Sequence, residues 1–489
     1  MKKIKIQTKS EEIEYQDPFK LYCSLTNNGN NISLLMESRS INLKYGRMSI
    51  IVPNPAIKIT GKNENFMLKA LNPLGREIIK CFSKDDFSYA DEYEQSEDMI
   101  KGIAKAEDNP NAEEHEKIKQ KNVSFVLRTI LNKFDSESPY AGAYGAFAYD
   151  FAKSFYKTKD KFSNNPGNDF VLFMPSVVYR FNDIKEKAEK LEFIFNGIKA
   201  KDDSTKGFEF IKQGKKSSYD MDEKEYLEKV KKIKNDIKNG RVMQCVFSRK
   251  LSIALQKHPV DSYSELREIN PSPYSFFYNL GDNEILYGAS PERHITIENK
   301  EIEIRPIAGT VQRSKNPLED AQARIKLLTD EKEIREHTML VDLARHELYK
   351  LSEPKSVYVS DLYTIEQYPN LYHLVSGVKG KLKKGIDAVD ALLITLPAGT
   401  LSGAPKLEAM KMIGEYENSR RGFYGGAIGY ISFNGDCNTG ITIRSIHVAN
   451  NESNVRSGGG IVSLSSPENE LAETKLKAEK MLKILGEKK

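Results

Sequence analysis

Apolar and polar residues alternate in short strand-like runs along most of the chain. In the first part these runs lie at residues 48–52, 170–179 and 191–195, and they are rich in Val, Ile and Phe. Similar runs return further on, at residues 242–253, 274–278 and 295–304. Helical patterns lie between them without regular βαβ alternation. The pattern therefore predicts an α+β fold with large antiparallel sheets.

Longer segments show the spacing of amphipathic helices. One begins after Asp222, a residue type common at N-caps, repeats apolar residues at helical spacing from Tyr226 to Ile237, and ends before Gly240. Further helical patterns cover residues 320–351 and 468–485.

Polar stretches divide the chain. Residues 93–122 are strongly charged and poor in apolar residues, which predicts a solvated helix or loop. Residues 196–222 are rich in lysine, serine and aspartate, and the character of the chain changes after them. We therefore predict an N-terminal region at residues 1–215 and a C-terminal region at residues 216–489.

The overall charge is low for a chain of this size. The sequence has 489 residues and a formal net charge of +5, with lysine and glutamate mixed along the whole length. A protein that binds nucleic acid or a membrane surface usually gathers its positive charge in clusters, so we expect neither partner. The length suffices for more than one domain and a substantial core.

Cysteine spacing and hydropathy indicate an intracellular protein. Cys23, Cys81, Cys245 and Cys437 are far apart and form no CxxC pair, which disfavours a zinc ribbon or a disulfide framework. The start, MKKIKIQTKSEE, lacks the apolar stretch of a signal peptide, and no segment has the ~18 apolar residues of a membrane span. We therefore expect a cytoplasmic location.

Paired carboxylates on two predicted helices suggest a metal site. Glu333 and Glu336 share one helix face with His337, and Glu470 and Glu473 share a face of the last helix. Oxygen ligands favour Mg²⁺ over zinc, and Mg²⁺ leaves room for a substrate carboxylate. For either helix taken alone, a solvated charged face is the alternative.

Glycine-rich runs near the C-terminus suggest an anion site. They are PAGTLSGAPK from Pro397, RGFYGGAIGY from Arg421 and SGGG from Ser457. Glycines let backbone N–H groups crowd around an anion, and Arg444 adds a planar fork suited to a carboxylate. The spacing in GTLSGAPK does not fit a nucleotide-binding phosphate loop.

Single residues elsewhere are candidates for acid–base chemistry. Glu292, in the run SPER, lies at a strand edge, where a carboxyl withdrawn from water could act as a general acid. Gly309 and Thr310 end the run RPIAGT, and His373 lies between apolar residues in LYHLVS. Taken alone, these patterns also fit a solvated turn glutamate, a simple turn and a core histidine.

The order of the motifs resembles that of the chorismate-utilising enzymes, and within them of anthranilate synthase component I. The motifs are SPER, RPIAGT, EIREHTMLVDLAR, HLVSGVKG, LPAGTLSGAPK, YGGAIGY, TIRS, SGGGIV and PENELAET. The resemblance is dense over residues 220–485 and thinner before them. It implies antiparallel sheets packed as a sandwich with flanking helices, a tryptophan-binding regulatory region at residues 1–215 and a chorismate-binding catalytic region at residues 216–489.

Two positions bear on the reaction. Family members that add water carry a lysine base where this chain has Gln244, which disfavours isochorismate or salicylate synthesis. Aminodeoxychorismate synthases typically carry a nucleophilic lysine where this chain has Ala308. The resemblance therefore implies Mg²⁺-dependent amination of chorismate with ammonia and elimination of pyruvate, giving anthranilate for tryptophan biosynthesis. Aminodeoxychorismate synthase component I is the alternative, and isochorismate or salicylate synthase a weaker one.

The resemblance also implies roles for individual residues. In the catalytic set, which includes Gln244, Glu292 would protonate the departing C4 hydroxyl and His373 would assist aromatisation. Glu336 and Glu473 would hold Mg²⁺, with Glu333 and Glu470 alongside. The substrate-binding residues would be Gly309, Thr310, Thr400, Tyr424, Arg444, Gly458, Gly459, Gly460 and Lys477.

The source of ammonia and the regulation of the enzyme also follow from the resemblance. The chain shows no amidotransferase segment with a nucleophilic cysteine, so glutamine would serve only with a separate glutamine amidotransferase subunit, component II. Residues 31–41, NISLLMESRSI, resemble the L-L-E-S run of members inhibited by L-tryptophan.

In such a tryptophan site, Glu37 and Ser38 could accept hydrogen bonds from the ammonium group. Pro273 and Tyr274 would lie against the indole. Relatives often carry methionine at Ser275 and cysteine at the position of Gly440, so the affinity for tryptophan can differ here. An ordinary strand with a polar end is the alternative.

Overall fold

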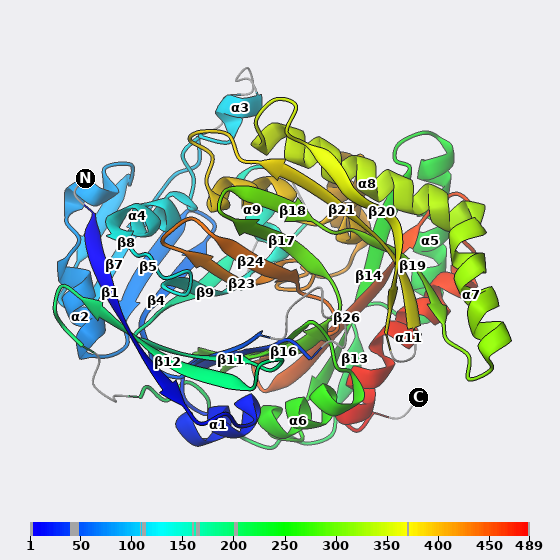
Figure 1. Ribbon diagram of the computed structural model, residues 1–489. Helices are drawn as coiled ribbons and strands as arrows, with labels where there is room; N and C mark the ends of the chain where they lie inside the picture. The colour runs from blue at the N-terminus through cyan, green and yellow to red at the C-terminus, as the bar shows by residue number, and fades with distance from the viewer. Residues whose placement is uncertain are drawn as a thin grey trace.

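The computed structural model describes residues 3–39, 48–107, 109, 114–158, 161–162, 167–199, 204–368 and 371–487. Two large sheets of 13 strands each lie face to face, and helices cover their outer sides (Figure 1). The predicted α+β class with sheets packed as a sandwich is confirmed.

The first sheet has one edge near the C-terminal helix and the other near the N-terminus. In spatial order it contains β13 (Ser217–Tyr219), β14 (Gln244–Ala254), β26 (Glu452–Ile461), β25 (Ser445–Ala449), β16 (Glu284–Ser290), β15 (Tyr274–Gly281), β2 (Ser33–Glu37), β3 (Met48–Val52), β11 (Val177–Asn182), β12 (Lys187–Phe195), β1 (Ile4–Ile13) and β8 (Phe134–Asp135). The short strand β22 (Gly403–Ala404) pairs with β14.

The second sheet is built in the same way from both halves of the chain. In spatial order it contains β19 (Ile307–Gln312), β21 (Leu371–Lys381), β18 (Glu301–Ile304), β17 (Arg293–Glu298), β24 (Cys437–Ile441), β23 (Ala427–Ser432), β9 (Gly142–Phe147), β10 (Phe170–Pro175), β4 (Pro55–Lys62), β5 (Asn65–Ala70), β7 (Met99–Ile103) and β6 (Glu92–Gln95). Strand β20 (Tyr358–Gln367) pairs with β21.

The α-helices of the described residues pack around these sheets. They are α1 (Pro18–Leu25), α2 (Pro73–Lys80), α3 (Glu114–Lys117), α4 (Phe125–Lys133), α5 (Glu223–Lys238), α6 (Pro259–Ile269), α7 (Pro317–Thr329), α8 (Glu331–Leu351), α9 (Ala388–Thr395), α10 (Lys406–Tyr416) and α11 (Pro467–Ile484). Helices α6 and α11 lie on the outer side of the first sheet, and α8 and α9 on that of the second (Figure 1).

Both sheets continue across the predicted boundary near residue 215. In the first sheet β2 pairs with β15, so that Glu37 lies opposite Ser275. In the second sheet β9 pairs with β23, with Gly145 opposite Gly429. The two predicted regions therefore share their sheets and their core, and the division into regulatory and catalytic roles stays a prediction.

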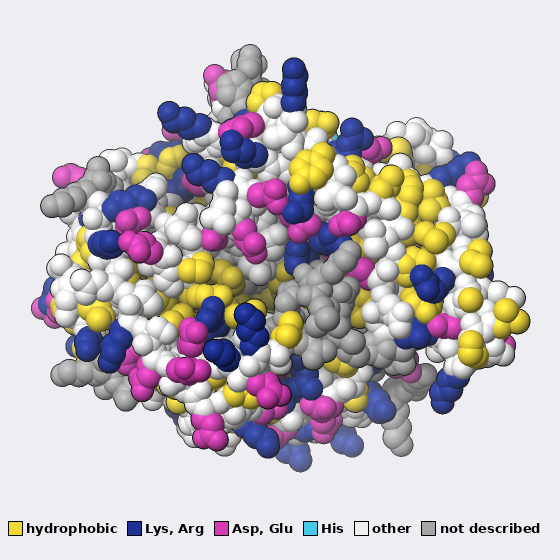
Figure 2. Space-filling model, in the orientation of Figure 1, with side chains coloured by type: hydrophobic (Ala, Val, Ile, Leu, Met, Phe, Trp, Pro, Cys, Tyr) yellow, Lys and Arg dark blue, Asp and Glu magenta, His cyan; other side chains and the backbone are white. Residues whose placement is uncertain are grey.

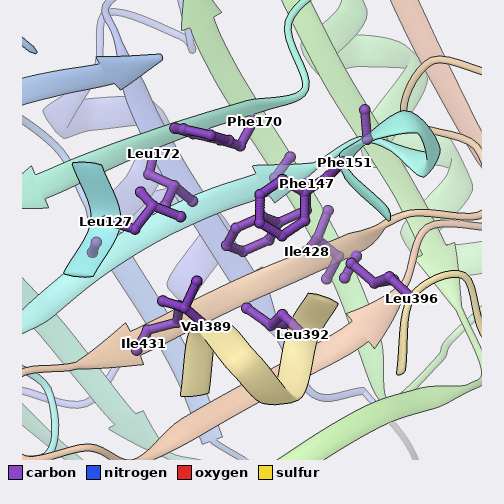
Figure 3. Packing of buried hydrophobic residues seen from close by; sticks show 14 of the residues in the cluster. Leu127, Phe147, Phe151, Phe170, Leu172, Val389, Leu392, Leu396, Ile428 and Ile431 are labelled. Carbon is purple, nitrogen blue, oxygen red and sulfur yellow. The ribbon is translucent and has the colours of Figure 1, made fainter. Parts of the chain in front are cut away.

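Apolar side chains hold the helices to the sheets. Val389 and Leu392 of α9 lie against Ile428 and Ile431 of β23, beside Phe147 of β9 (Figure 3). All of these side chains are buried in one continuous cluster. The packing fixes α9, and with it the loop that follows α9, against the second sheet.

Several predicted elements are confirmed. Helix α5 begins after Asp222, whose side chain accepts a hydrogen bond from Glu225 N as an N-cap, and it buries its apolar face. Strand β3 has the predicted bounds. The last predicted helix is α11.

Other predicted elements were wrong in their extent. The helical pattern at residues 320–351 is two helices, because Asp330 leaves the helical conformation and its side chain accepts from Glu333 N at the start of α8. The run at residues 170–179 is two strands in different sheets, β10 and β11. Residues 93–122, predicted as a helix or loop, contribute to the edge hairpin β6–β7, where Ile100 is buried.

The surface agrees with the mixed charge of the sequence. Figure 2 shows basic and acidic side chains interspersed over one face of the molecule. None of the helices formed by the described residues is long and apolar enough to cross a membrane.

Candidate active site

Two of the crossovers between the sheets carry Glu292 and Arg444. The chain passes from β16 in the first sheet to β17 in the second at Glu292, and from β24 back to β25 at Arg444. Backbone hydrogen bonds join the crossovers, from Ile441 N to Glu292 O (3.0 Å) and from Ala289 N to Arg444 O (3.1 Å). The sheet architecture therefore brings the two crossovers, one with Glu292 and the other with Arg444, side by side.

Glu292 has the environment of a general acid. Its side chain is 7% exposed, and its Oε1 accepts a hydrogen bond from the Thr400 hydroxyl at 2.9 Å. Burial raises the pKa of Glu292 to about 7, although the hydrogen bond from Thr400 and the charge of Lys477 act in the opposite direction. A substantial fraction of this carboxyl is therefore protonated near neutral pH and can donate a proton.

His373 lies on β21 directly opposite Thr310 on β19. The Thr310 hydroxyl is 2.8 Å from His373 Nδ1. Burial lowers the pKa of His373, although the backbone of Gly309 and the charge of Glu366 oppose the shift. The imidazole is therefore neutral near pH 7 and able to accept a proton.

Arg444 forms the centre of a cationic group with Lys477 of α11. Arg444 Nη1 donates to the backbone oxygen of Lys477 at 2.5 Å. Lys477 Nζ donates to Gly458 O at 3.0 Å and lies 2.6 Å from Glu473 Oε1. Burial lowers the pKa of Arg444, whereas Tyr424 and the charge of Glu473 act to raise it. The cluster suits a carboxylate ligand.

The glycines of β26 make room for functional side chains. A Cβ at Gly459 would lie 2.8 Å from Glu470 Oε2, and a Cβ at Gly460 would lie 2.2 Å from Gln244 Nε2. Gln244 is buried at the start of β14, and its Oε1 has no hydrogen-bond partner among the described residues. Side chains at these positions of β26 would displace both groups.

The predicted metal ligands lie on α8 and α11. A Cβ at Gly309 would lie 3.0 Å from Glu333 Oε2, so the Glu333 carboxylate lies close to Gly309 of β19. Glu336 lies one turn further on and is partly exposed. The described residues contain no ready-made group of three or more acidic, histidine or cysteine side chains that could hold a metal ion.

His337, on the same face of α8 in the sequence pattern, has a different role. It is fully buried, its Nε2 lies 2.6 Å from the Ser376 hydroxyl, and burial lowers its pKa to about 4. The hydrogen bond of this neutral histidine to Ser376 stabilises the packing of α8 against β21.

Electrostatic interactions connect these groups into one site. Burial raises the pKa of Glu292 and the charge of Lys477 opposes this shift, whereas burial and the charge of Arg444 both lower the pKa of His373. The candidate site therefore contains a buried carboxyl group, a neutral imidazole and the cations Lys477 and Arg444.

Sequence reasoning missed the buried ion pairs that support the site. Arg421 Nη1 donates to Leu401 O at 2.5 Å, next to Thr400, and Arg421 Nη2 lies 2.6 Å from Glu417 Oε1. Glu417 also accepts from the backbone and hydroxyl of Ser248. Arg421 begins the glycine-rich run RGFYGGAIGY, but the sequence around Glu417 is polar and gives no indication that Glu417 is buried.

The residues predicted to bind L-tryptophan also lie together. Tyr274 donates from its hydroxyl to Asn438 Oδ1 at 2.9 Å, and a Cβ at Gly440 would lie 2.6 Å from its ring. Ser275 is buried and donates to Ser272 O, and Pro273 and Ser38 are also buried. The end of the motif, Ser40 and Ile41, lies outside the described residues.

Glu37 is already engaged in this region. Its carboxylate lies 2.6 Å from Arg267 Nη2 and accepts from the Tyr263 hydroxyl at 2.6 Å. An ammonium group at Glu37 would therefore share a carboxylate that an arginine already neutralises.

The chain is similar to one family of known proteins over most of its length. Residues 84–483 match the family described as chorismate binding enzyme. Anthranilate synthase component 1 of Buchnera aphidicola subsp. Rhopalosiphum maidis is 33% identical over 93% of this chain and 92% of that protein. The protein of the same name from Aquifex aeolicus (strain VF5) is 32% identical over 97% of this chain and 93% of that protein.

A solved structure extends the agreement to the fold. The crystal structure of anthranilate synthase component I from Streptococcus pneumoniae TIGR4 has a TM-score of 0.67 at 29% identity, covering 89% of this chain and 92% of that chain. Because the family match and the relatives extend over most of its length, the chain belongs to the chorismate binding enzyme family, in the branch of anthranilate synthase component 1.

Proposed function

We propose that the protein converts chorismate and ammonia into anthranilate, pyruvate and water, the first step of tryptophan biosynthesis. The observation that supports the proposal is the pair of crossovers joined by backbone hydrogen bonds, one with the buried acid Glu292 and the other with the cation Arg444. Chorismate needs both, because it has two carboxylates to bind and a hydroxyl that leaves only when protonated.

The residues of the chain account for two chemical stages. Arg444 would bind a carboxylate of the substrate through its planar fork. Glu292 would then donate its proton to the C4 hydroxyl while ammonia attacks C2, so that the C4–O bond breaks and water departs. Neutral His373, held by Thr310, would assist the second stage, in which the C2 proton is lost and pyruvate leaves.

We also propose a Mg²⁺ site at Glu336 and Glu473, with Glu333 and Glu470 alongside. The donors fit the ion, since Mg²⁺ prefers oxygen, keeps several waters and is usually held by one or two protein carboxylates plus the substrate. The glycine positions support the site, because Gly309 and Gly459 leave space that a Cβ would take from Glu333 and Glu470. When bound, the ion would supply positive charge to the ring carboxylate of chorismate.

Two positions argue against other members of the family. Gln244 is not a base that could activate water, which disfavours isochorismate and salicylate synthesis. Ala308, beside Gly309 on β19, has no nucleophile, which disfavours aminodeoxychorismate synthesis. Aminodeoxychorismate synthase component I remains the second candidate, because the two reactions share their first stage.

The name component 1 of the relatives supports a partner subunit. We propose that a separate glutamine amidotransferase supplies ammonia from glutamine, and that L-tryptophan inhibits the enzyme at Glu37, Ser38, Pro273, Tyr274 and Ser275. We also propose a cytoplasmic location, with which the free thiols of all four cysteines agree.

Product analysis tests the proposed function directly. The purified protein is incubated with chorismate, ammonium and Mg²⁺, and the products are separated and identified. Anthranilate, recognised by its fluorescence, together with an equal amount of pyruvate is the expected result. Aminodeoxychorismate without pyruvate would establish the second candidate, and isochorismate would contradict the interpretation of Gln244.

A further inference from the structure

His373 has a neighbour on each side of its strand. Across one edge of β21 it lies opposite Thr310 of β19, and across the other edge it lies opposite Glu366 of β20 (Figure 1). Residues directly opposite each other in antiparallel strands project from the same face, with their Cβ atoms ~4.5–5.5 Å apart. A hydroxyl, an imidazole and a carboxylate therefore stand in one row across three strands.

Glu366 is the member of this row that the proposed mechanism does not use. Its side chain is 3% exposed. Its Oε1 lies 3.1 Å from Arg305 Nη2, and its Oε2 accepts a hydrogen bond from the Tyr368 hydroxyl at 3.3 Å. The ring of Tyr368 in turn meets the imidazole of His373 edge-on, with 5.1 Å between the ring centroids. The carboxylate is thus buried and held in one orientation on the strand beside His373.

Arg305 neutralises the carboxylate of Glu366 only in part. The same guanidinium also pairs with Glu303 at 3.1 Å and with Asp361 at 3.0 Å. The charge of Arg305 is therefore divided among three carboxylates. The field of Glu366 can still act on a neighbouring group such as His373, because charges are screened less in a buried site than in water.

We propose that Glu366 stabilises the imidazolium that His373 becomes when it takes the C2 proton in the second chemical stage. The inference rests on the proposed function of His373 as the base of that stage. Glu366 is a positioning residue, because it acts on His373 and not on the substrate. The arrangement follows a general pattern, in which a carboxylate beside a catalytic histidine stabilises its charged form.

The bonds and protons of this stage balance. The C2–H bond breaks and the proton passes to His373. The electron pair of that bond forms the C2–C3 double bond of the aromatic ring, and the C3–O bond breaks with its pair on the oxygen of the departing enolpyruvate. The proton then passes to the enolpyruvate, which becomes pyruvate, and the imidazole returns to its neutral form.

Other groups also act on the imidazole. Burial lowers the pKa of His373 and the charge of Arg444 acts in the same direction, whereas the Gly309 backbone and the charge of Glu366 oppose them. From α8, the carboxylate of Glu333 lies close to Gly309, at the proposed Mg²⁺ site. The base is therefore neutral at rest, and the fixed carboxylate on β20 favours the charged form that it takes during the reaction.

Three substitutions separate this role from a purely structural one. Glu366→Gln keeps the size of the side chain and an oxygen that can accept from Arg305, but it removes the charge. Glu366→Asp keeps the charge on a shorter side chain. Asp361→Asn is the matched control, because Asp361 pairs with the same arginine from the same strand but lies opposite Gly377 rather than His373. If Glu366 only holds Arg305 in place, Glu366→Gln and Asp361→Asn should slow both chemical stages alike.

Single-turnover reactions measure the two stages separately, through the loss of chorismate and the release of pyruvate. We expect Glu366→Gln to leave the first stage within about twofold of the wild type and to slow the second ~3–10-fold, which corresponds to a fall of about half to one pH unit in the pKa of the base. Glu366→Asp should retain more of the second stage, and Asp361→Asn should slow neither. Equal slowing of both stages in Glu366→Gln, or the same loss in Asp361→Asn, would overturn the proposal.

The pH profile of pyruvate release gives a further readout. A base works in its neutral form, so the rate of this stage rises as the pH increases through the pKa of His373. Without the carboxylate of Glu366 that pKa is lower, and the rising limb should move to lower pH in Glu366→Gln. A rising limb that stays in place would count against the proposal, since a structural defect lowers the rate without moving the limb.

NMR provides a test that does not depend on the reaction. The chain has seven histidines, and in protein labelled at histidine the signal of His373 is the one that His373→Met removes. We expect the pKa of His373 to be about half to one pH unit lower in Glu366→Gln than in the wild type, less than the ~1–3 that an unshared neighbouring charge gives. An unchanged pKa would refute the proposal even if anthranilate is formed. A lowered pKa in a protein that forms no anthranilate would instead contradict the proposed function alone.

Discussion

The Thr310 hydroxyl lies 2.8 Å from Nδ1 of His373, and the two residues are direct partners across β19 and β21. The strand pairing thus sets the orientation of the imidazole, and burial keeps it neutral. A neutral base with a fixed orientation is what the loss of a proton from C2 requires, since a charged imidazolium has no free electron pair.

We expect His373→Met to separate the two stages. The variant should still consume chorismate, because Glu292 is intact, but it should accumulate the amino-substituted intermediate that keeps its enolpyruvyl group. Thr310→Val, which removes only the hydroxyl, should slow pyruvate release less than His373→Met does. Chromatography of the quenched reaction detects the intermediate. If the His373→Met variant does not consume chorismate, His373 acts in substrate binding rather than in the second stage.

Replacement of Glu292 by glutamine should stop the first stage. We expect chorismate to remain unconsumed, with kcat lower by ~10²–10⁴-fold, because the amide cannot donate the proton that the hydroxyl needs. A normal affinity for chorismate would show that the variant is folded and binds. Rapid amination by Glu292→Gln would assign the acid to another group.

The activity should also depend on pH through Glu292. The acid works in its protonated form, and burial raises its pKa to about 7. Activity should therefore be present below this pH and be lost as the pH rises through it. The profile of kcat must be measured at constant free ammonia, since the nucleophile itself becomes more abundant at high pH. The falling limb should disappear from the residual activity of Glu292→Gln.

Removal of one predicted metal ligand should abolish Mg²⁺-dependent turnover. Glu336→Gln and Glu473→Gln each replace a charged oxygen donor by an amide, which binds Mg²⁺ poorly. Glu331→Gln is the matched control, because Glu331 stands on the same helix but is 79% exposed and paired with Arg335. Turnover is measured over a Mg²⁺ titration at saturating chorismate. Activity like that of the wild type at limiting Mg²⁺ would contradict the metal assignment.

Local sequence periodicity predicted the helices and strands better than it predicted which strands pair with each other. The spacing from Asp222 to Ile237 was sufficient for α5, because a helix and its N-cap are set by neighbours within a few residues. The pairing of β2 with β15 joins segments far apart in the sequence, and no local pattern contains it. The same holds for the crossovers that bring Glu292 and Arg444 together.

The candidate site was predicted from motifs, whereas its supporting residues were not. Glu292, Thr310 and His373 stood in recognised runs, and the structure gives each a partner in the site. Glu417 lies in a polar run that locally resembles solvated surface, yet it is buried with Arg421.

The residues predicted to bind tryptophan lie where β2 meets β15, with Glu37 opposite Ser275 and the ring of Tyr274 against Gly440. We expect L-tryptophan to inhibit the wild type. Ser38→Arg should relieve inhibition without loss of uninhibited activity, since Ser38 is buried at the end of β2 and a long cationic side chain there would repel the ammonium group.

Ser38→Ala serves as the matched control, because it removes the hydroxyl without adding bulk or charge. It should weaken inhibition less than Ser38→Arg, by the loss of one hydrogen bond of ~0.5–1.5 kcal/mol. Inhibition curves at fixed chorismate, together with thermal unfolding, separate lost binding from lost folding. The carboxylate of Glu37 already forms an ion pair with Arg267. We therefore expect the ammonium group of tryptophan to interact with Glu37 and its carboxylate with Arg267. Indifference of the wild type to millimolar tryptophan would refute this regulatory site while leaving the catalytic assignment intact.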